Sequence, residues 1–85
     1  MNRYELLNEL ADELINKKED VIMSMIKGEF VFTVEKEKDN YSVNIYNYLG
    51  EKQLLSFYND INKAIEKLTK CSFKEIKEFK KWFYV

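Results

Sequence analysis

The stretch Phe30-Val31-Phe32-Thr33-Val34-Glu35-Lys36-Glu37-Lys38-Asp39-Asn40-Tyr41-Ser42-Val43-Asn44-Ile45 decides the fold. β-branched and aromatic residues dominate its first part and alternate between two sides of an extended chain. Lys38-Asp39-Asn40 then indicates a hairpin, because Asp and Asn tolerate the positive φ of tight turns. With Asp39 and Asn40 as the two turn residues, Val34 faces Ile45 on one apolar side. The sequence therefore predicts two antiparallel strands.

The segment after the hairpin continues the sheet and then turns helical. A second turn around Gly50-Glu51 leads to a third short strand, roughly Gln53 to Tyr58, in which either Leu54 or Leu55 points inward. Asn59 or Asp60 next caps a helix. The inward residues of that helix recur at helical spacing: Ile61, Ala64, Ile65 and Leu68.

A further helix is predicted from Ser72, because Ser72 and Glu75 have the spacing of a capping box. Its apolar stripe consists of Phe73, Ile76, Phe79 and Phe83. Just before it lies Cys71, between Lys70 and Lys74, where neighbouring positive charge can favour a thiolate. The preferred interpretation of Cys71 is a small apolar residue that fills a joint between helices.

Before the hairpin, apolar residues recur every three or four positions, which predicts an amphipathic helix. These residues are Tyr4, Leu7, Leu10, Ala11, Leu14, Val21 and Met25. The polar residues 16–20 interrupt the pattern. They form either a solvated turn of one helix that continues to Lys27, or a break after which Asp20 caps a second, short helix. Gly28 suits the helix end, because glycine accepts the left-handed conformation there.

The element order therefore predicts one α+β domain over residues 1–85. It comprises an N-terminal helix, which is either continuous or broken near 17–20, a three-stranded antiparallel meander sheet and two C-terminal helices. The helices are expected to pack on one face of the sheet.

Two absences from the composition narrow the function. The chain has no His and one Cys, so it lacks the commonest general base and metal ligand and cannot form an internal disulfide. The two glycines stand alone at predicted turns, so there is no Gly-rich phosphate loop. We therefore expect a protein that is not an enzyme and binds no cofactor or metal. The absence of disulfides and of any long apolar run favours a cytoplasmic protein without a membrane span.

The formal charge of −1 conceals an asymmetry along the chain. Residues 63–81 hold seven lysines against three glutamates, which gives +4, and the residues before 63 carry seven basic and twelve acidic side chains, which gives −5. Such an asymmetry bears on the choice of partner more than the total does.

A protein partner is the first expectation. In the predicted register Val31, Tyr46 and Tyr48 lie on the outer face of the sheet, and exposed tyrosines suit protein recognition. The alternative is that a helix covers this face. The acidic first helix is a second candidate surface, which presents Glu9, Asp12 and Glu13 to a basic partner in the manner of nucleic-acid phosphates. Strand addition at the sheet edge and a homodimer are further possibilities.

Nucleic-acid binding is the alternative function. The predicted last helix interleaves basic and aromatic side chains, which suits a phosphate backbone with stacked bases. The residues concerned are Lys74, Lys77, Lys80, Lys81 and Trp82. The same pattern also describes an ordinary amphipathic helix whose lysines face water.

The helix–three-strand–helix order resembles double-stranded RNA-binding domains. The second helix of that family opens with clustered lysines, whereas Asn59-Asp60-Ile61-Asn62-Lys63 opens with an acid and one lysine, so the family's function is not carried over. The order with a further helix is also similar to small phage-encoded inhibitors, including certain anti-CRISPR proteins. That resemblance implies a small phage or mobile-element inhibitor that acts by covering the surface of a larger partner.

Overall fold

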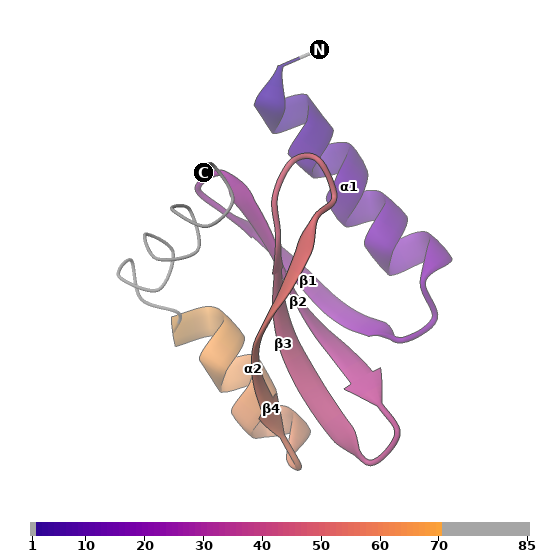
Figure 1. Ribbon diagram of the computed structural model, residues 1–85, viewed down its shortest axis with the longest axis vertical. Helices are drawn as coiled ribbons and strands as arrows, with labels where there is room; N and C mark the ends of the chain where they lie inside the picture. Colours follow the sequence, from indigo (N-terminus) through magenta and orange to yellow (C-terminus); the bar gives the residue numbers. More distant parts are fainter. Residues whose placement is uncertain (1, 71–85) are drawn as a thin grey trace.

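The computed structural model describes residues 2–70 (Figure 1). The chain begins with helix α1 (Arg3–Lys17) and continues through strands β1 (Val21–Lys27), β2 (Phe30–Glu37), β3 (Asn40–Tyr46) and β4 (Lys52–Tyr58). Helix α2 (Ile61–Lys70) follows. The α+β class is confirmed, but the sheet has four strands rather than three. The helix predicted from Ser72, with Cys71 before it, lies outside the described residues.

The strands form an antiparallel meander in the order β1-β2-β3-β4, with one helix against each face (Figure 1). Helix α1 packs through Leu7 and Leu14 onto Val31 and Tyr46, whereas α2 packs on the opposite face. The prediction that the helices share one face was wrong. Both faces of β2 and β3 carry residues that need burial, so each face requires its own cover.

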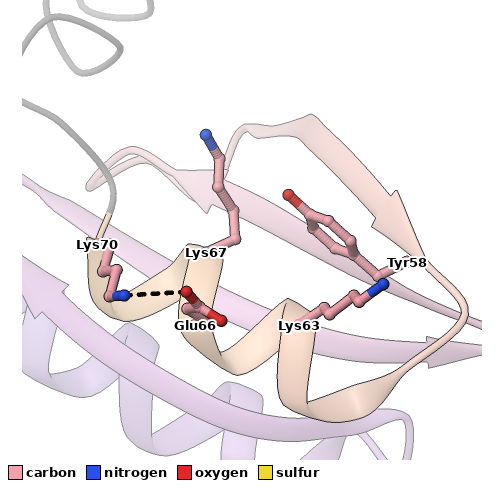
Figure 2. Close-up of a pocket in the computed structure, with 5 residues that line it drawn as sticks. All are labelled: Tyr58, Lys63, Glu66, Lys67 and Lys70. Atoms are coloured by element: carbon pink, nitrogen blue, oxygen red, sulfur yellow. Dashed lines mark hydrogen bonds and ion pairs between the residues drawn. The ribbon is translucent and has the colours of Figure 1, made fainter.

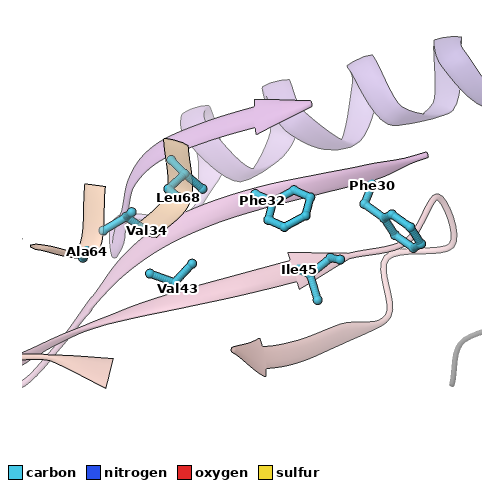
Figure 3. Close-up of a cluster of buried hydrophobic side chains, with 7 residues drawn as sticks. All are labelled: Phe30, Phe32, Val34, Val43, Ile45, Ala64 and Leu68. Atoms are coloured by element: carbon cyan, nitrogen blue, oxygen red, sulfur yellow. The ribbon is translucent and has the colours of Figure 1, made fainter. Parts of the chain in front are cut away.

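The larger buried cluster lies between the sheet and α2 (Figure 3). Its members are Phe30, Phe32, Val34, Val43, Ile45, Ala64 and Leu68, each exposed by 1% or less. The period-two alternation in β2 and β3 and the helical spacing in α2 bring them to one layer. The predicted inward positions Ala64 and Leu68 of α2 are therefore confirmed.

Helix α1 has a defined beginning and end. The side chain of Asn2 caps it by accepting a hydrogen bond from the Glu5 amide at 2.9 Å. The chain turns extended at Lys18, so the helix stops where the polar 16–20 segment begins. Of the two alternatives for this segment, the continuous helix to Lys27 is wrong, and so is a second helix capped by Asp20.

Strand β1 was not predicted. Val21 and Met25 have the four-residue spacing of a helix, but they lie on a strand that pairs with β2. Val21 packs under α1, while Met25 contacts the cluster on the opposite face. Gly28 does adopt positive φ, at 61°, but it serves the turn between β1 and β2 rather than a helix end. Pairing with a neighbouring strand overrides the local periodicity here.

The β2–β3 register differs from the predicted one by two residues. Val34 pairs with Val43 instead of Ile45, and Phe32 pairs with Ile45. The turn residues are Lys38, which has a φ of 51°, and Asp39. A shift of two residues preserves the side-chain faces, so the face assignments were right although the partners were not.

Both edge strands of the described sheet carry a β-bulge. In β1 the register shifts between Val21 and Met23, and in β4 it shifts around Leu55. The second bulge lets Leu55 pack on the core while Leu54 remains 43% exposed. Of the two alternatives for the inward residue of this strand, Leu55 is therefore correct. Bulges blunt edge strands against pairing with other chains. They therefore disfavour partner binding by strand addition.

Neither described helix is long and apolar enough to cross a membrane.

Candidate functional site

Helix α1 and the loop between β3 and β4 line an open pocket of about 210 Å³. It is lined by Leu6, Glu9, Leu10, Glu13, Tyr48, Leu49 and Gly50. Three residues predicted from the sequence as binding residues meet there: Glu9, Glu13 and Tyr48. At least 35 positions separate each of the two acids from Tyr48. The tertiary structure thus joins two surfaces that the sequence presented as separate candidates.

The helical repeat of α1 explains how the acids reach the pocket. Leu7 and Leu14 point into the sheet, and the neighbouring flank of the helix carries Leu10 with Glu9 and Glu13. Glu9 and Glu13 are exposed and one turn apart, so their carboxylates lie along the same rim. Glu13 also contacts Lys17 at 3.6 Å, but both side chains are exposed, and such pairs contribute little. The rim therefore keeps its negative character.

Tyr48 forms the aromatic wall of the site and is half-buried. The Arg3 guanidinium lies 4.9 Å from the centre of its ring, within the range of a cation–π contact. Arg3 also pairs with Glu29 at 3.3 Å, which ties the start of α1 to the β1–β2 turn. One guanidinium is thus already held beside Tyr48, which shows that the ring accepts a cation.

The loop that completes the pocket is held in shape by Asn47, which the sequence analysis missed. The Asn47 side-chain oxygen accepts from the amides of Leu49 at 3.1 Å and Glu51 at 2.9 Å, and its amide donates to the Glu51 carboxylate at 2.9 Å. Asn47 is 2% exposed, whereas Leu49 is 67% exposed. Gly50 closes the turn with a φ of 83°. An Asn three residues before a turn glycine was the available signal.

Replacing Asn47 by Ala should loosen this loop. The change removes three hydrogen bonds of the loop, and a typical hydrogen bond contributes about 0.5–1.5 kcal/mol to stability. We expect a lower midpoint of urea denaturation and faster amide exchange at Leu49 and Glu51. Asn40→Ala, at the first residue of β3, is the matched control. Unchanged exchange at both amides in the Asn47 variant would show that the loop keeps its shape without this side chain.

The remaining predicted protein-binding residues lie elsewhere. Val31 is fully buried and Tyr46 is 4% exposed, both beneath α1. Of the two alternatives for this face, the one in which a helix covers it is therefore correct, and these two residues do not form an exposed binding face. Their position on the outer side of the hairpin was right, but α1 covers that side. Asp12 is exposed on α1 and does not line the pocket. The alternative residues Lys74, Lys77, Lys80, Lys81 and Trp82 lie outside the described residues.

Beneath α1 the sheet holds a buried carboxylate, Glu35, whose side chain is 3% exposed. It accepts hydrogen bonds from Thr33 at 2.6 Å and Tyr46 at 2.7 Å. Lys18 at 3.2 Å and Lys52 at 3.1 Å approach its other oxygen. Burial by itself raises the pKa of Glu35, but these four donors outweigh it and bring the pKa to about 2.

The same arrangement explains why Tyr46 is not a surface residue. Burial raises the pKa of the Tyr46 hydroxyl, and its hydrogen bond to the Glu35 carboxylate raises it further. Tyr46 therefore stays protonated and serves as a donor to Glu35. Lys18 follows α1 and Lys52 begins β4, so this cluster fixes the helix end and the loop end against the sheet. The cluster positions the walls of the pocket and does not line it.

Comparison with known protein families, with curated proteins and with solved structures found no match to this chain.

Proposed function

We propose that this chain is a non-enzymatic protein-binding module that seats a cationic, partly apolar segment of another protein in the pocket between α1 and the β3–β4 loop. The observation that carries the proposal is the convergence of Glu9, Glu13 and Tyr48 on one concavity. Two exposed carboxylates match Lys or Arg side chains, and the Tyr48 ring, which already holds the Arg3 guanidinium, adds an aromatic wall. Leu49, exposed on a tethered loop, adds apolar area at low entropic cost.

A small protein with this surface acts by occupying a basic face of a larger partner. Glu5, Glu9, Asp12 and Glu13 all lie on α1 and present negative charge in the way that nucleic-acid phosphates do. A basic partner face that normally holds nucleic acid would then be covered. This is the inhibitor function that the resemblance to small phage-encoded proteins implies. The charge of α1 and the pocket support it here. The order of the elements does not support it, because the sheet has one strand more than that resemblance assumed.

The pocket can be tested with peptides selected for binding to the full chain from a random display library. We expect enrichment of Lys or Arg beside apolar residues. The double variant Glu9→Lys with Glu13→Lys should weaken the selected peptides at least about tenfold, through loss of two charge pairs and gain of repulsion. Fluorescence anisotropy on labelled peptides measures the change, and circular dichroism checks the fold.

The matched control carries the same change of charge outside the pocket. Glu19→Lys with Asp20→Lys alters two exposed acids that lie after α1 and do not line the pocket. This control should retain most of the affinity. Equal loss in both double variants would mean that the overall field, and not the pocket, attracts the peptide. Selection of peptides without basic residues would refute the proposed partner chemistry.

Nucleic-acid binding through the Lys-rich C-terminal part is the alternative function. The described part of that region, α2, carries Lys63, Lys67 and Lys70 against one acid, Glu66. This local excess of positive charge is the observation that favours it. It concerns the face of the sheet opposite α1, so the two functions use separate surfaces.

A further inference from the structure

The described residues line open pockets on both faces of the sheet. The larger pocket, of about 400 Å³, lies where α2 passes the end of β4 (Figure 2). Its described lining is Tyr58, Lys63, Glu66, Lys67 and Lys70. The ion pair drawn there, between Lys70 and Glu66 at 2.9 Å, joins two exposed residues of the same helix (Figure 2). Such a pair contributes little to the position of one element relative to another.

The pocket at α1 differs, because the only arginine of the chain lies beside it. The sequence has 14 basic residues, and Arg3 is the single one that is not a lysine. Arginine has a planar guanidinium that stacks on aromatic rings and donates hydrogen bonds in a fixed fork, whereas lysine has a point charge. Arg3 uses both properties, since its guanidinium lies 4.9 Å from the centre of the Tyr48 ring and 3.3 Å from the Glu29 carboxylate.

These two contacts join three parts of the fold that are distant in the sequence. Arg3 begins α1, Glu29 lies in the turn between β1 and β2, and Tyr48 lies in the loop between β3 and β4. Glu29 is 26 positions from Arg3, and Tyr48 is 45 positions from it. The guanidinium therefore links the beginning of the helix to two separate connections of the sheet.

The position of the β3–β4 loop against α1 depends on contacts that cross from one to the other. One wall of the pocket is a flank of α1, and the other is the loop with Tyr48. The side-chain hydrogen bonds of Asn47 run to Leu49 and Glu51, which follow it closely in the same connection. They set the shape of the loop, whereas the contact of Arg3 with Tyr48 spans both walls.

Arg3 supports the Tyr48 wall from outside the pocket. It is not one of the described residues that line the pocket, although Tyr48 is. Its guanidinium also occupies the place over the ring that a cation of a partner would otherwise take. The carboxylates of Glu9 and Glu13 are then the groups left for such a cation. They lie about 9 and 15 Å further along the helix axis, at about 1.5 Å per residue.

We propose that Arg3 is a positioning residue of the α1 pocket, which holds the Tyr48 wall against the helix and directs a basic side chain of the partner protein to Glu9 and Glu13. This inference rests on the proposed protein-binding function. It adds a division of the site into an aromatic end, supported by Arg3, and an acidic end. A wall held in place before binding also lowers the entropic cost of ordering the site.

The sign of the effect of removing Arg3 distinguishes positioning from simple charge. Loss of a positive charge beside an acidic site strengthens its attraction for a cationic peptide. Loss of the support of Tyr48 weakens binding, because the wall must then be ordered when the peptide binds. Arg3→Gln should therefore weaken binding of the basic peptides selected on the full chain by about two- to fivefold. Fluorescence anisotropy on the labelled peptides measures the change.

Two further variants make the test specific. Lys36→Gln removes the same charge from an exposed position on β2 that does not line the pocket, and it should leave the peptide affinity nearly unchanged. Tyr48→Leu removes the ring on which Arg3 acts. In that background Arg3→Gln should change the affinity by less than about 1.5-fold, because the effects of two residues in contact are not additive. Circular dichroism checks the fold of each variant.

A second measurement needs no partner. In the free ¹⁵N-labelled full chain, Arg3→Gln should shift the amide resonances of Tyr48 and Leu49, because the ring is no longer held in one orientation. The amides of Lys38 and Asp39, in the turn between β2 and β3, should keep their positions.

The outcomes separate this inference from the function on which it rests. If wild type binds the basic peptides, then equal or tighter binding by Arg3→Gln, additive effects of Arg3→Gln and Tyr48→Leu, or unmoved amides of Tyr48 and Leu49 would overturn the role of Arg3 alone. Failure to select any basic peptide on wild type would overturn the protein-binding function and the role of Arg3 with it.

Discussion

Replacing Glu35 by Gln is expected to lower the free energy of unfolding at neutral pH by about 3 kcal/mol. The pKa of this carboxyl falls from 4.5 to about 2 on folding, and each unit of such a shift is worth about 1.4 kcal/mol. Gln keeps the shape of the side chain and can still accept from Thr33 and Tyr46, but it no longer carries the charge that attracts Lys18 and Lys52. The variant therefore removes the charge together with the acceptor oxygen that faces the two lysines.

The pH dependence gives this prediction a signature. Because the pKa of Glu35 is lowered on folding, its contribution is fully present above the unfolded value of 4.5 and is lost as the pH falls toward about 2. Urea denaturation measured from pH 7 to pH 2 should show the gap between wild type and variant closing over that window. Glu37→Gln, at an exposed position on the same strand, is the control and should lie close to wild type throughout. A gap that does not narrow on acidification would show that the charge of Glu35 does not stabilise the fold.

Replacing Leu68 by Ala should destabilise the protein by about 2–5 kcal/mol. Leu68 is fully buried and joins α2 to the cluster of Figure 3, so its truncation leaves a cavity between the helix and the sheet. A domain of 85 residues has a total stability of about 4–13 kcal/mol, and the change would remove a large share of it.

The matched control for this cavity is another leucine. Leu54 is 43% exposed on β4, and Leu54→Ala should shift the free energy of unfolding by about 0.5 kcal/mol or less. Thermal or urea denaturation compares the two variants. Similar small effects at both positions would indicate that α2 contributes little to the stability of the sheet.

In the structure, the described acidic and basic residues of the two pockets lie on opposite sides of the sheet. The acidic part of the chain supplies Glu9 and Glu13 on one side of the sheet, and the basic part supplies Lys63 and Lys67 on the other. The sheet keeps the two sets apart, so each can attract a partner of opposite sign.

Much of the fold could be read from local patterns. The helix from Arg3 to Lys17, the β2–β3 hairpin, the third predicted strand and α2 all have periodicities or caps that do not depend on distant residues. Strand β1 could not be predicted in this way. The spacing of Val21 and Met25 fits a helix as well as a strand, and the pairing with β2 decides between them.

The candidate sites depended more heavily on the tertiary structure. Glu9, Glu13 and Tyr48 could be singled out by residue type, but their meeting in one pocket depends on the crossing of α1 over the sheet. The sequence contains no strong indication that Asn47 or Glu35 is important. A polar residue in a loop or on a strand is expected to be exposed, and only the positions of its hydrogen-bond partners show that it is buried.

The sequence by itself determined the α+β class, the hairpin faces, the apolar stripes of the described helices and the opposite charges of the two parts of the chain. Only the tertiary structure decided that the helices take opposite faces, that Val31 and Tyr46 are buried, and that each pocket forms. The physical reason is the separation along the chain between the residues that interact. Backbone conformation and side-chain periodicity are set by near neighbours, whereas burial and pockets depend on which distant elements cover a surface.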